Sequence, residues 1–79
     1  MISFISLRFI GDTPISILEG IVDKIASLHI TYGIGCLFDR SNDLILRFKL
    51  KEDVKEGDIW NVYDILESYS HWIVNTEES

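Results

Sequence analysis

The feature that most constrains this chain is the order in which its hydrophobic periodicity changes along the sequence. Residues 3–10 alternate between the two faces of a strand, residues 18–28 carry apolar side chains at helical spacing, and residues 30–38 and 44–50 alternate again. Period-two alternation is typical of half-buried strands, and a spacing of three and four residues is typical of an amphipathic helix. The first part of the chain is therefore predicted to form a strand, a helix and a β-hairpin.

The remaining residues predict one more helix and one more strand. Apolar side chains recur at helical spacing after residue 58: Ile59, Val62, Tyr63, Leu66 and Tyr69. Asp58 is suited to cap this helix, because a carboxylate accepts hydrogen bonds from free amides of the first turn. Residues 71–74 are apolar and β-prone, so we expect a last strand there, and residues 75–79 are expected to form a flexible tail.

This order of elements, βαββαβ, predicts the overall architecture. Its usual closure is a ferredoxin-like sandwich: a four-stranded antiparallel sheet in the order 4-1-3-2, with two helices on one face. A chain of 79 residues has room for one hydrophobic core, so residues 1–79 are expected to form a single domain. The periodicity predicts that this core contains Ile5, Leu7, Phe9, Leu18, Ile21, Val22, Ile25, Ile34, Leu46, Phe48, Val62 and Leu66.

Such a sandwich leaves the second face of its sheet without a covering layer. The side chains expected on this open face are Phe4, Ser6, Arg8, Leu37, Ile45, Arg47 and Lys49, and Lys51 is also expected to project toward it. RNA-recognition sheets stack bases on outward aromatic residues of their central strands, whereas here Phe48 is expected to point inward. An uncovered apolar face instead favours a protein contact, and we expect a homodimer.

The charge and the hydrophobic pattern limit which partners the chain is expected to bind and where it is expected to be located. Thirteen acidic and seven basic residues give a net charge of −6, which repels nucleic acid and steers basic partners toward the chain. The four carboxylates between residues 52 and 58 do not match an EF-hand loop and are expected to be solvated. No apolar run reaches the roughly 18 residues of a membrane span, and the first residues do not resemble a signal peptide, so a cytoplasmic location is expected.

No arrangement of residues indicates catalysis. Cys36 is the only cysteine, and no motif places His29 or His71 beside it as a base. Cys36 shares its predicted strand face with Tyr32, Ile34 and Phe38, so we expect it to be buried as a small hydrophobic residue. The sequence therefore predicts a chain that is not an enzyme, with no catalytic residue, no metal site and no cofactor.

The turn after the first predicted strand carries a family resemblance. Gly11-Asp12-Thr13-Pro14 ends the strand, and Asp12 or Thr13 is expected to cap the following helix. Together with Arg8-Phe9-Ile10 and with residues 30–34, this turn resembles ACT-type and NIL-type regulatory domains over about half the chain. In those families an Asp-x-Pro-Gly turn closes the first strand, and Ile15 stands here in place of that glycine. The resemblance implies a ferredoxin-like sensor that binds an amino acid at Gly11, Asp12 and Thr13.

Two functions follow from these observations. The first is a non-catalytic regulatory or ligand-binding module, expected to be dimeric, that senses an amino acid or a similar metabolite. The second is a small acidic inhibitor or immunity-type protein that binds a basic protein partner and needs no pocket. A ligand module should gain thermal stability from a metabolite, whereas an inhibitor should gain it only from a protein.

Overall fold

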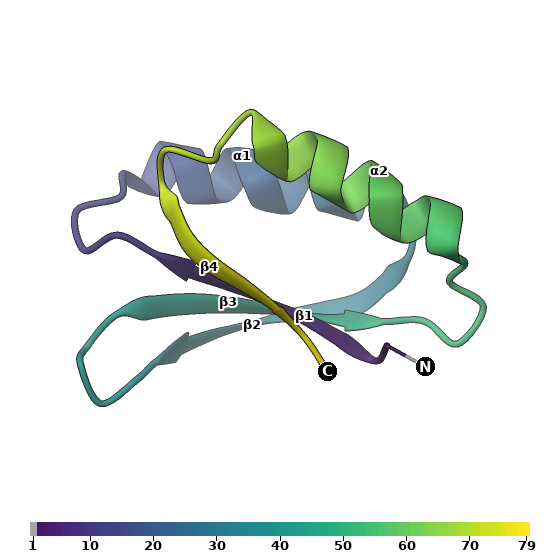
Figure 1. Ribbon diagram of the computed structural model, residues 1–79, viewed down its shortest axis with the longest axis horizontal. Helices are drawn as coiled ribbons and strands as arrows, with labels where there is room; N and C mark the ends of the chain where they lie inside the picture. The colour runs from purple at the N-terminus through teal and green to yellow at the C-terminus, as the bar shows by residue number, and fades with distance from the viewer. Residues whose placement is uncertain (1) are drawn as a thin grey trace.

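The computed structural model describes residues 2–79, which form six elements in the predicted order. The strands are β1 (Phe4–Phe9), β2 (Thr31–Phe38), β3 (Leu44–Leu50) and β4 (Ile73–Glu78), and the helices are α1 (Ile15–Ala26) and α2 (Glu56–Glu67). They fold as an α+β sandwich in which both helices lie on the same side of one sheet (Figure 1). The α+β prediction is confirmed, and no helix of residues 2–79 covers the second face of the sheet.

The sheet has four strands in the order β2-β3-β1-β4, and every neighbouring pair is antiparallel. Read from its opposite edge, the same sheet runs β4-β1-β3-β2. β1 and β3 therefore occupy the centre, while β2 and β4 each pair with a single strand of the described residues. Among residues 2–79, no helix has the length and apolarity to cross a membrane.

The core lies between the sheet and the two helices. Ile5, Leu7 and Phe9 point into it from β1, and each is at most 1% exposed. Ile21 and Ile25 cover them from α1, as Val62 and Leu66 do from α2. Leu18 and Val22 are only partly buried and pack against the rim of this core. Burial of these apolar side chains is the main force that holds the layers together.

Two predictions of burial in β2 are wrong, that of Ile34 in the core and that of Cys36 as a small buried residue. Ile34 is 37% exposed, and Cys36 is exposed as well. Both oppose buried residues of β3, Phe48 and Leu46 respectively, so their side chains do point toward the helix side of the sheet. They remain exposed because β2 is an edge strand and the helix layer does not extend far enough to cover it.

A bulge at the start of β2 moves Tyr32 to a different face from the one predicted. The pairing with β3 shifts between Thr31 and Gly33, so the strict alternation of faces is broken at Tyr32. Tyr32 lines a hollow on the open face together with Phe4 of β1. The prediction that Tyr32 shares a face with Ile34 is therefore wrong.

Both helices begin differently from the sequence prediction. Pro14 precedes the first residue of α1, and no side chain caps that end; the Thr13 hydroxyl instead donates to the carbonyl of Ile10 at 2.7 Å. Helix α2 begins at Glu56, so Asp58 lies within its first turn rather than before it. Its carboxylate accepts a hydrogen bond from the backbone N–H of Lys55 at 2.9 Å and so still stabilises the helix start.

Residues 75–79 do not form the predicted flexible tail. They belong largely to β4, in which Glu78 pairs with Ile5 and Glu77 pairs with Ser6 of β1. The carbonyl of Ser79 also accepts hydrogen bonds from the backbone N–H groups of Ser3 and Phe4, at 2.7 and 2.9 Å. Without β4, the outer edge of β1 would have no partner strand, and pairing of its backbone groups offsets the weak apolar content of this segment.

Candidate functional site

The predicted ligand loop lies at the surface, between β1 and α1. Gly11 and Asp12 are exposed, and nothing lies within 4 Å of the position that a side chain would take at Gly11. Thr13 is half-buried and uses its hydroxyl within the turn. The structure thus brings the three residues together, but the hollows found on the described surface are lined by other residues.

The most unusual surface of the molecule is β2. Its last seven residues, Tyr32 to Phe38, are all exposed, although none of them is charged. Phe38 is 66% exposed, Tyr32 56% and Leu37 46%. β2 pairs only with β3, so the backbone N–H and C=O groups along its outer edge meet no other strand of the described chain. An apolar edge without charges is a surface to which another strand can pair.

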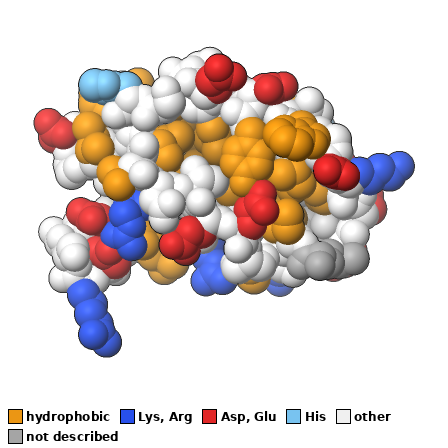
Figure 2. Space-filling view, viewed as in Figure 1, with side chains coloured by type: hydrophobic (Ala, Val, Ile, Leu, Met, Phe, Trp, Pro, Cys, Tyr) orange, Lys and Arg blue, Asp and Glu red, His pale blue; other side chains and the backbone are white. Residues whose placement is uncertain are grey.

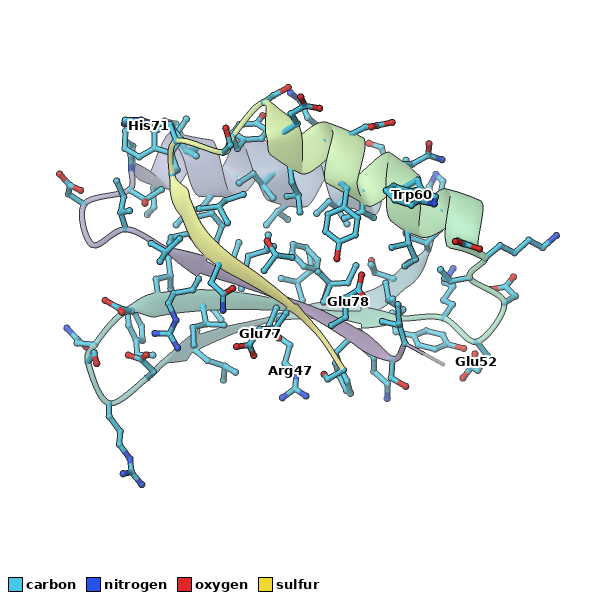
Figure 3. All side chains as sticks on the ribbon, viewed as in Figure 1. Arg47, Glu52, Trp60, His71, Glu77 and Glu78 are labelled. Atoms are coloured by element: carbon cyan, nitrogen blue, oxygen red, sulfur yellow. The ribbon has the colours of Figure 1, made fainter. Side chains whose placement is uncertain are left out.

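The opposite edge of the sheet has the features that β2 lacks. β4 carries the polar or charged side chains of Asn75, Glu77 and Glu78. Figure 3 shows Glu77 and Glu78 on this strand, and the Asn75 amide donates to the Glu77 carboxylate at 3.1 Å. Charges on an edge strand oppose pairing with a further strand. The charges of β4 therefore protect that edge from a further strand, whereas β2 has no such protection. This difference is expected if only β2 contacts a partner.

The open face beside β2 combines apolar and basic groups. The Arg47 guanidinium lies 4.0 Å from the centre of the Phe4 ring, and the Lys49 ammonium lies 6.0 Å from the centre of the Tyr32 ring. Together with Gly33, Gly35 and Leu37, these four residues line a shallow hollow of about 440 Å³. Because the two glycines have no side chain, they leave a low strip in the surface of β2. Lys51 follows the last residue of β3 and lines a different hollow, beside α2.

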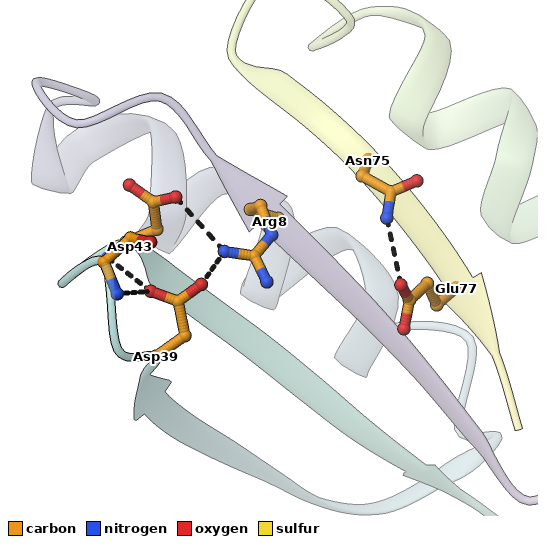
Figure 4. A network of polar contacts seen from close by, with 6 residues as sticks. Arg8, Asp39, Asp43, Asn75 and Glu77 are labelled. Carbon is orange, nitrogen blue, oxygen red and sulfur yellow. Dashed lines mark hydrogen bonds and ion pairs between the residues drawn. The ribbon is translucent and has the colours of Figure 1, made fainter.

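The third basic residue of the open face is already paired. Arg8 forms ion pairs with Asp39 and with Asp43, the latter at 3.1 Å (Figure 4). The Asp39 carboxylate also accepts hydrogen bonds from the backbone N–H groups of Ser41 and Asp43, at 2.9 and 3.0 Å. This network fastens the β2–β3 turn to β1 and neutralises Arg8 in place.

A second hollow, of about 540 Å³, lies between α2, the end of β4 and the loop before α2. Its apolar lining includes Val54, Ile59 and Trp60, and charged side chains surround it. Figure 2 shows hydrophobic side chains gathered on this side of the molecule, and Figure 3 shows Trp60 on α2 above Glu78 of β4. Trp60 is 62% exposed, so its indole is available to a ligand.

Two tyrosine–glutamate hydrogen bonds flank this hollow. The Tyr63 hydroxyl donates to the Glu78 carboxylate, and partial burial together with this bond raises the pKa of Tyr63 to about 12. The Tyr32 hydroxyl donates to Glu52, which raises the pKa of Tyr32 and lowers the pKa of Glu52. Each bond favours the ionised carboxylate and the neutral phenol.

Within residues 2–79, no group of three or more His, Cys, Asp or Glu side chains is placed to hold a metal ion. His71 packs edge-on against the ring of Trp72, with ring centres 5.0 Å apart. His29 lies after α1 with a φ of 57°, where the chain reverses toward β2. Neither histidine forms a described hydrogen bond with Cys36.

Comparison with protein families finds no family model that matches the chain, and comparison with curated proteins finds no match either. Sequence reasoning placed the candidate site at residues 11–13 and missed both β2 and the hollow beside α2. The missed signal for β2 is a run of eight residues, 31–38, that has no charge although it includes an edge of the sheet. The missed signal for the hollow beside α2 is Trp60, a large apolar residue that lies outside the apolar stripe of its helix.

Proposed function

We propose that this chain is a non-catalytic protein-binding module with a ferredoxin-like architecture. The element order βαββαβ, the sheet order and the placement of both helices on one side support this class of fold. The observation that carries the functional proposal is β2: an edge strand that is uncharged, apolar and exposed over seven consecutive residues. Leaving Leu37 and Phe38 in water is unfavourable, and a partner that covers them recovers that free energy.

The open face extends this contact surface. Arg47 and Lys49 hold their cationic groups over aromatic rings, so their aliphatic stems add apolar area while their charges remain available to a partner. Protein interfaces commonly have this composition, with apolar and aromatic side chains at the centre and charges around them. We assign the protein to the cytoplasm as part of this proposal, because a reducing compartment preserves the exposed thiol of Cys36.

A small-molecule function is the second candidate, and the hollow of about 540 Å³ beside α2 is the observation that favours it. Its size falls in the range of ligand pockets, and its charged border includes both Lys51 and Glu56. A zwitterionic ligand suits such a border, as it suits the free carboxylate of Asp12 in the loop proposed from the family resemblance.

A site-specific photo-crosslinker tests the protein-binding proposal. We would place benzoylphenylalanine at position 37 on β2 and, as a matched control, at position 74 on β4, because Leu37 and Val74 are both exposed apolar residues of edge strands. The proposal predicts a discrete cross-linked product from position 37 and little from position 74. The partner found in the cross-linked product, once purified, should bind the Leu37→Lys variant at least tenfold more weakly than the Val74→Lys variant. Equal cross-linking from both positions would count against the proposal.

A further inference from the structure

We infer that β2 binds β2 of a second copy of this chain, antiparallel, so that two four-stranded sheets join into one. This inference rests on the proposed protein-binding function and names its partner. The edge of β2 is free, and Thr31–Phe38 contains no proline and no charge that would prevent strand pairing. Homodimers are most often related by a twofold axis, and an antiparallel strand pair has this symmetry.

The side chains of β2 are complementary to themselves when Gly35 lies on the twofold axis. Leu37 then lies opposite Gly33 of the second copy, on the open face, where the absence of a side chain leaves space for it. On the helix side, Ile34 lies opposite Cys36 of the second copy, and each covers apolar surface of the other. Both faces of the pair thus place an apolar side chain against a small residue.

The two ends of β2 are also complementary in charge. In this register the end of β2 that leads to Arg40 lies next to the beginning of β2 in the second copy. Glu52 stands at that beginning, held by the Tyr32 hydroxyl, and Asp53 follows it. The Lys49 ammonium, 6.0 Å from the centre of the Tyr32 ring, offsets part of this negative charge. Arg40 is exposed, whereas Asp39 beside it is already paired with Arg8. Because the pair is symmetric, Arg40 of each copy lies toward Glu52 and Asp53 of the other copy.

The net charge predicts how this dimer responds to salt. Each copy carries a charge of −6, and the uncharged β2 strands are the surfaces that meet. Salt screens the repulsion between two copies of charge −6 and also the attraction at the two Arg40 ends. Because the repulsion involves the whole net charge and each end contact involves a single arginine, association should strengthen as the salt concentration rises. Binding of a basic protein to the same surface would weaken under those conditions, because its attraction to the acidic chain is screened.

Sedimentation equilibrium over a range of protein concentrations tests the inference. We expect the mass to rise from 9.1 kDa toward twice that value, with a smaller dissociation constant at high salt. Cys36→Lys and Leu37→Lys should each raise the dissociation constant at least tenfold, because each places two like charges near the axis. Val74→Lys, on the other edge strand, should leave it unchanged, and far-ultraviolet circular dichroism would verify that all variants fold.

A chain that stays at 9.1 kDa at all concentrations would overturn the inference, and so would an equal effect of Val74→Lys and Leu37→Lys. A monomer that still cross-links to a different protein from position 37 would overturn the second copy as the partner while leaving the proposed function standing. A monomer that cross-links to nothing from position 37 would overturn both.

Discussion

Truncating Phe48 to alanine probes the hydrophobic core that holds the sheet and the two helices together. Phe48 is 1% exposed, lies in the middle of the central strand β3 and pairs with Ile5 of β1 and Ile34 of β2. Removing a fully buried phenylalanine ring costs about 3 to 5 kcal/mol, through lost burial and the cavity that remains. A domain of 79 residues has a total stability of about 4 to 12 kcal/mol, so Phe48→Ala should remove much of it.

Phe38→Ala is the matched control, because it makes the same substitution on the neighbouring strand at a residue that is 66% exposed. Its expected cost is within about 0.5 kcal/mol, provided that both variants are measured at a dilution where the chain is monomeric. Urea unfolding followed by tryptophan fluorescence measures both. A loss below about 1 kcal/mol for Phe48→Ala, or equal losses for the two variants, would refute the inward orientation of Phe48.

Three further perturbations test separate parts of the structure. Absorbance titration should assign a pKa of about 12 to Tyr63, and Glu78→Gln should lower it. An unfolded tyrosine ionises near 10, so the stability from this pair is complete below that pH and is lost as the pH rises toward 12; a folded pKa at the ordinary value would contradict the bond. Gly20→Ala should gain up to about 1 kcal/mol of helix stability only in a Tyr69→Phe background, because the new Cβ would lie 3.0 Å from the Tyr69 hydroxyl oxygen. An equal gain in both backgrounds, measured by urea unfolding, would show that the hydroxyl imposes no limit. Asp12→Ala should change folding stability by less than about 0.5 kcal/mol, since Asp12 caps nothing here. If the loop binds an amino acid, calorimetric titration should show that Asp12→Ala weakens this binding by about 2 kcal/mol. An absence of heat when amino acids are titrated into the unsubstituted chain would exclude an amino acid as the ligand of this loop.

The elements of the fold were predictable because each central element shows its buried face in its own sequence. One buried side of each element is visible in the sequence, as the alternation of Ile5, Leu7 and Phe9 in β1 and the spacing of Ile21 and Ile25 in α1. Element boundaries were less predictable. β4 continues through Asn75, Thr76 and two glutamates, because pairing with β1 determines that segment more than its own apolar content does.

The exposure of β2 was not predictable from periodicity, since Ile34 and Phe38 alternate as buried residues would. Whether such a face is covered depends on how far the helices extend across the sheet, which is a property of the whole domain. The bulge that turns Tyr32 to the open face likewise leaves no local signal in the sequence. The candidate loop at residues 11–13 was located correctly as a turn, but the surface that distinguishes this molecule lies at the far edge of the sheet.

Hydrogen–deuterium exchange at low and high protein concentration tests the role of β2 most directly. Amide groups on the free edge of β2 exchange rapidly in a monomer and slowly when they pair with another strand. We predict that protection of residues 31–38 rises with protein concentration, while β4 and α2 keep the same exchange rates at every concentration. Rapid exchange of β2 at all concentrations, or added protection that appears on α2 or β4 instead, would contradict the pairing of β2 with a second copy.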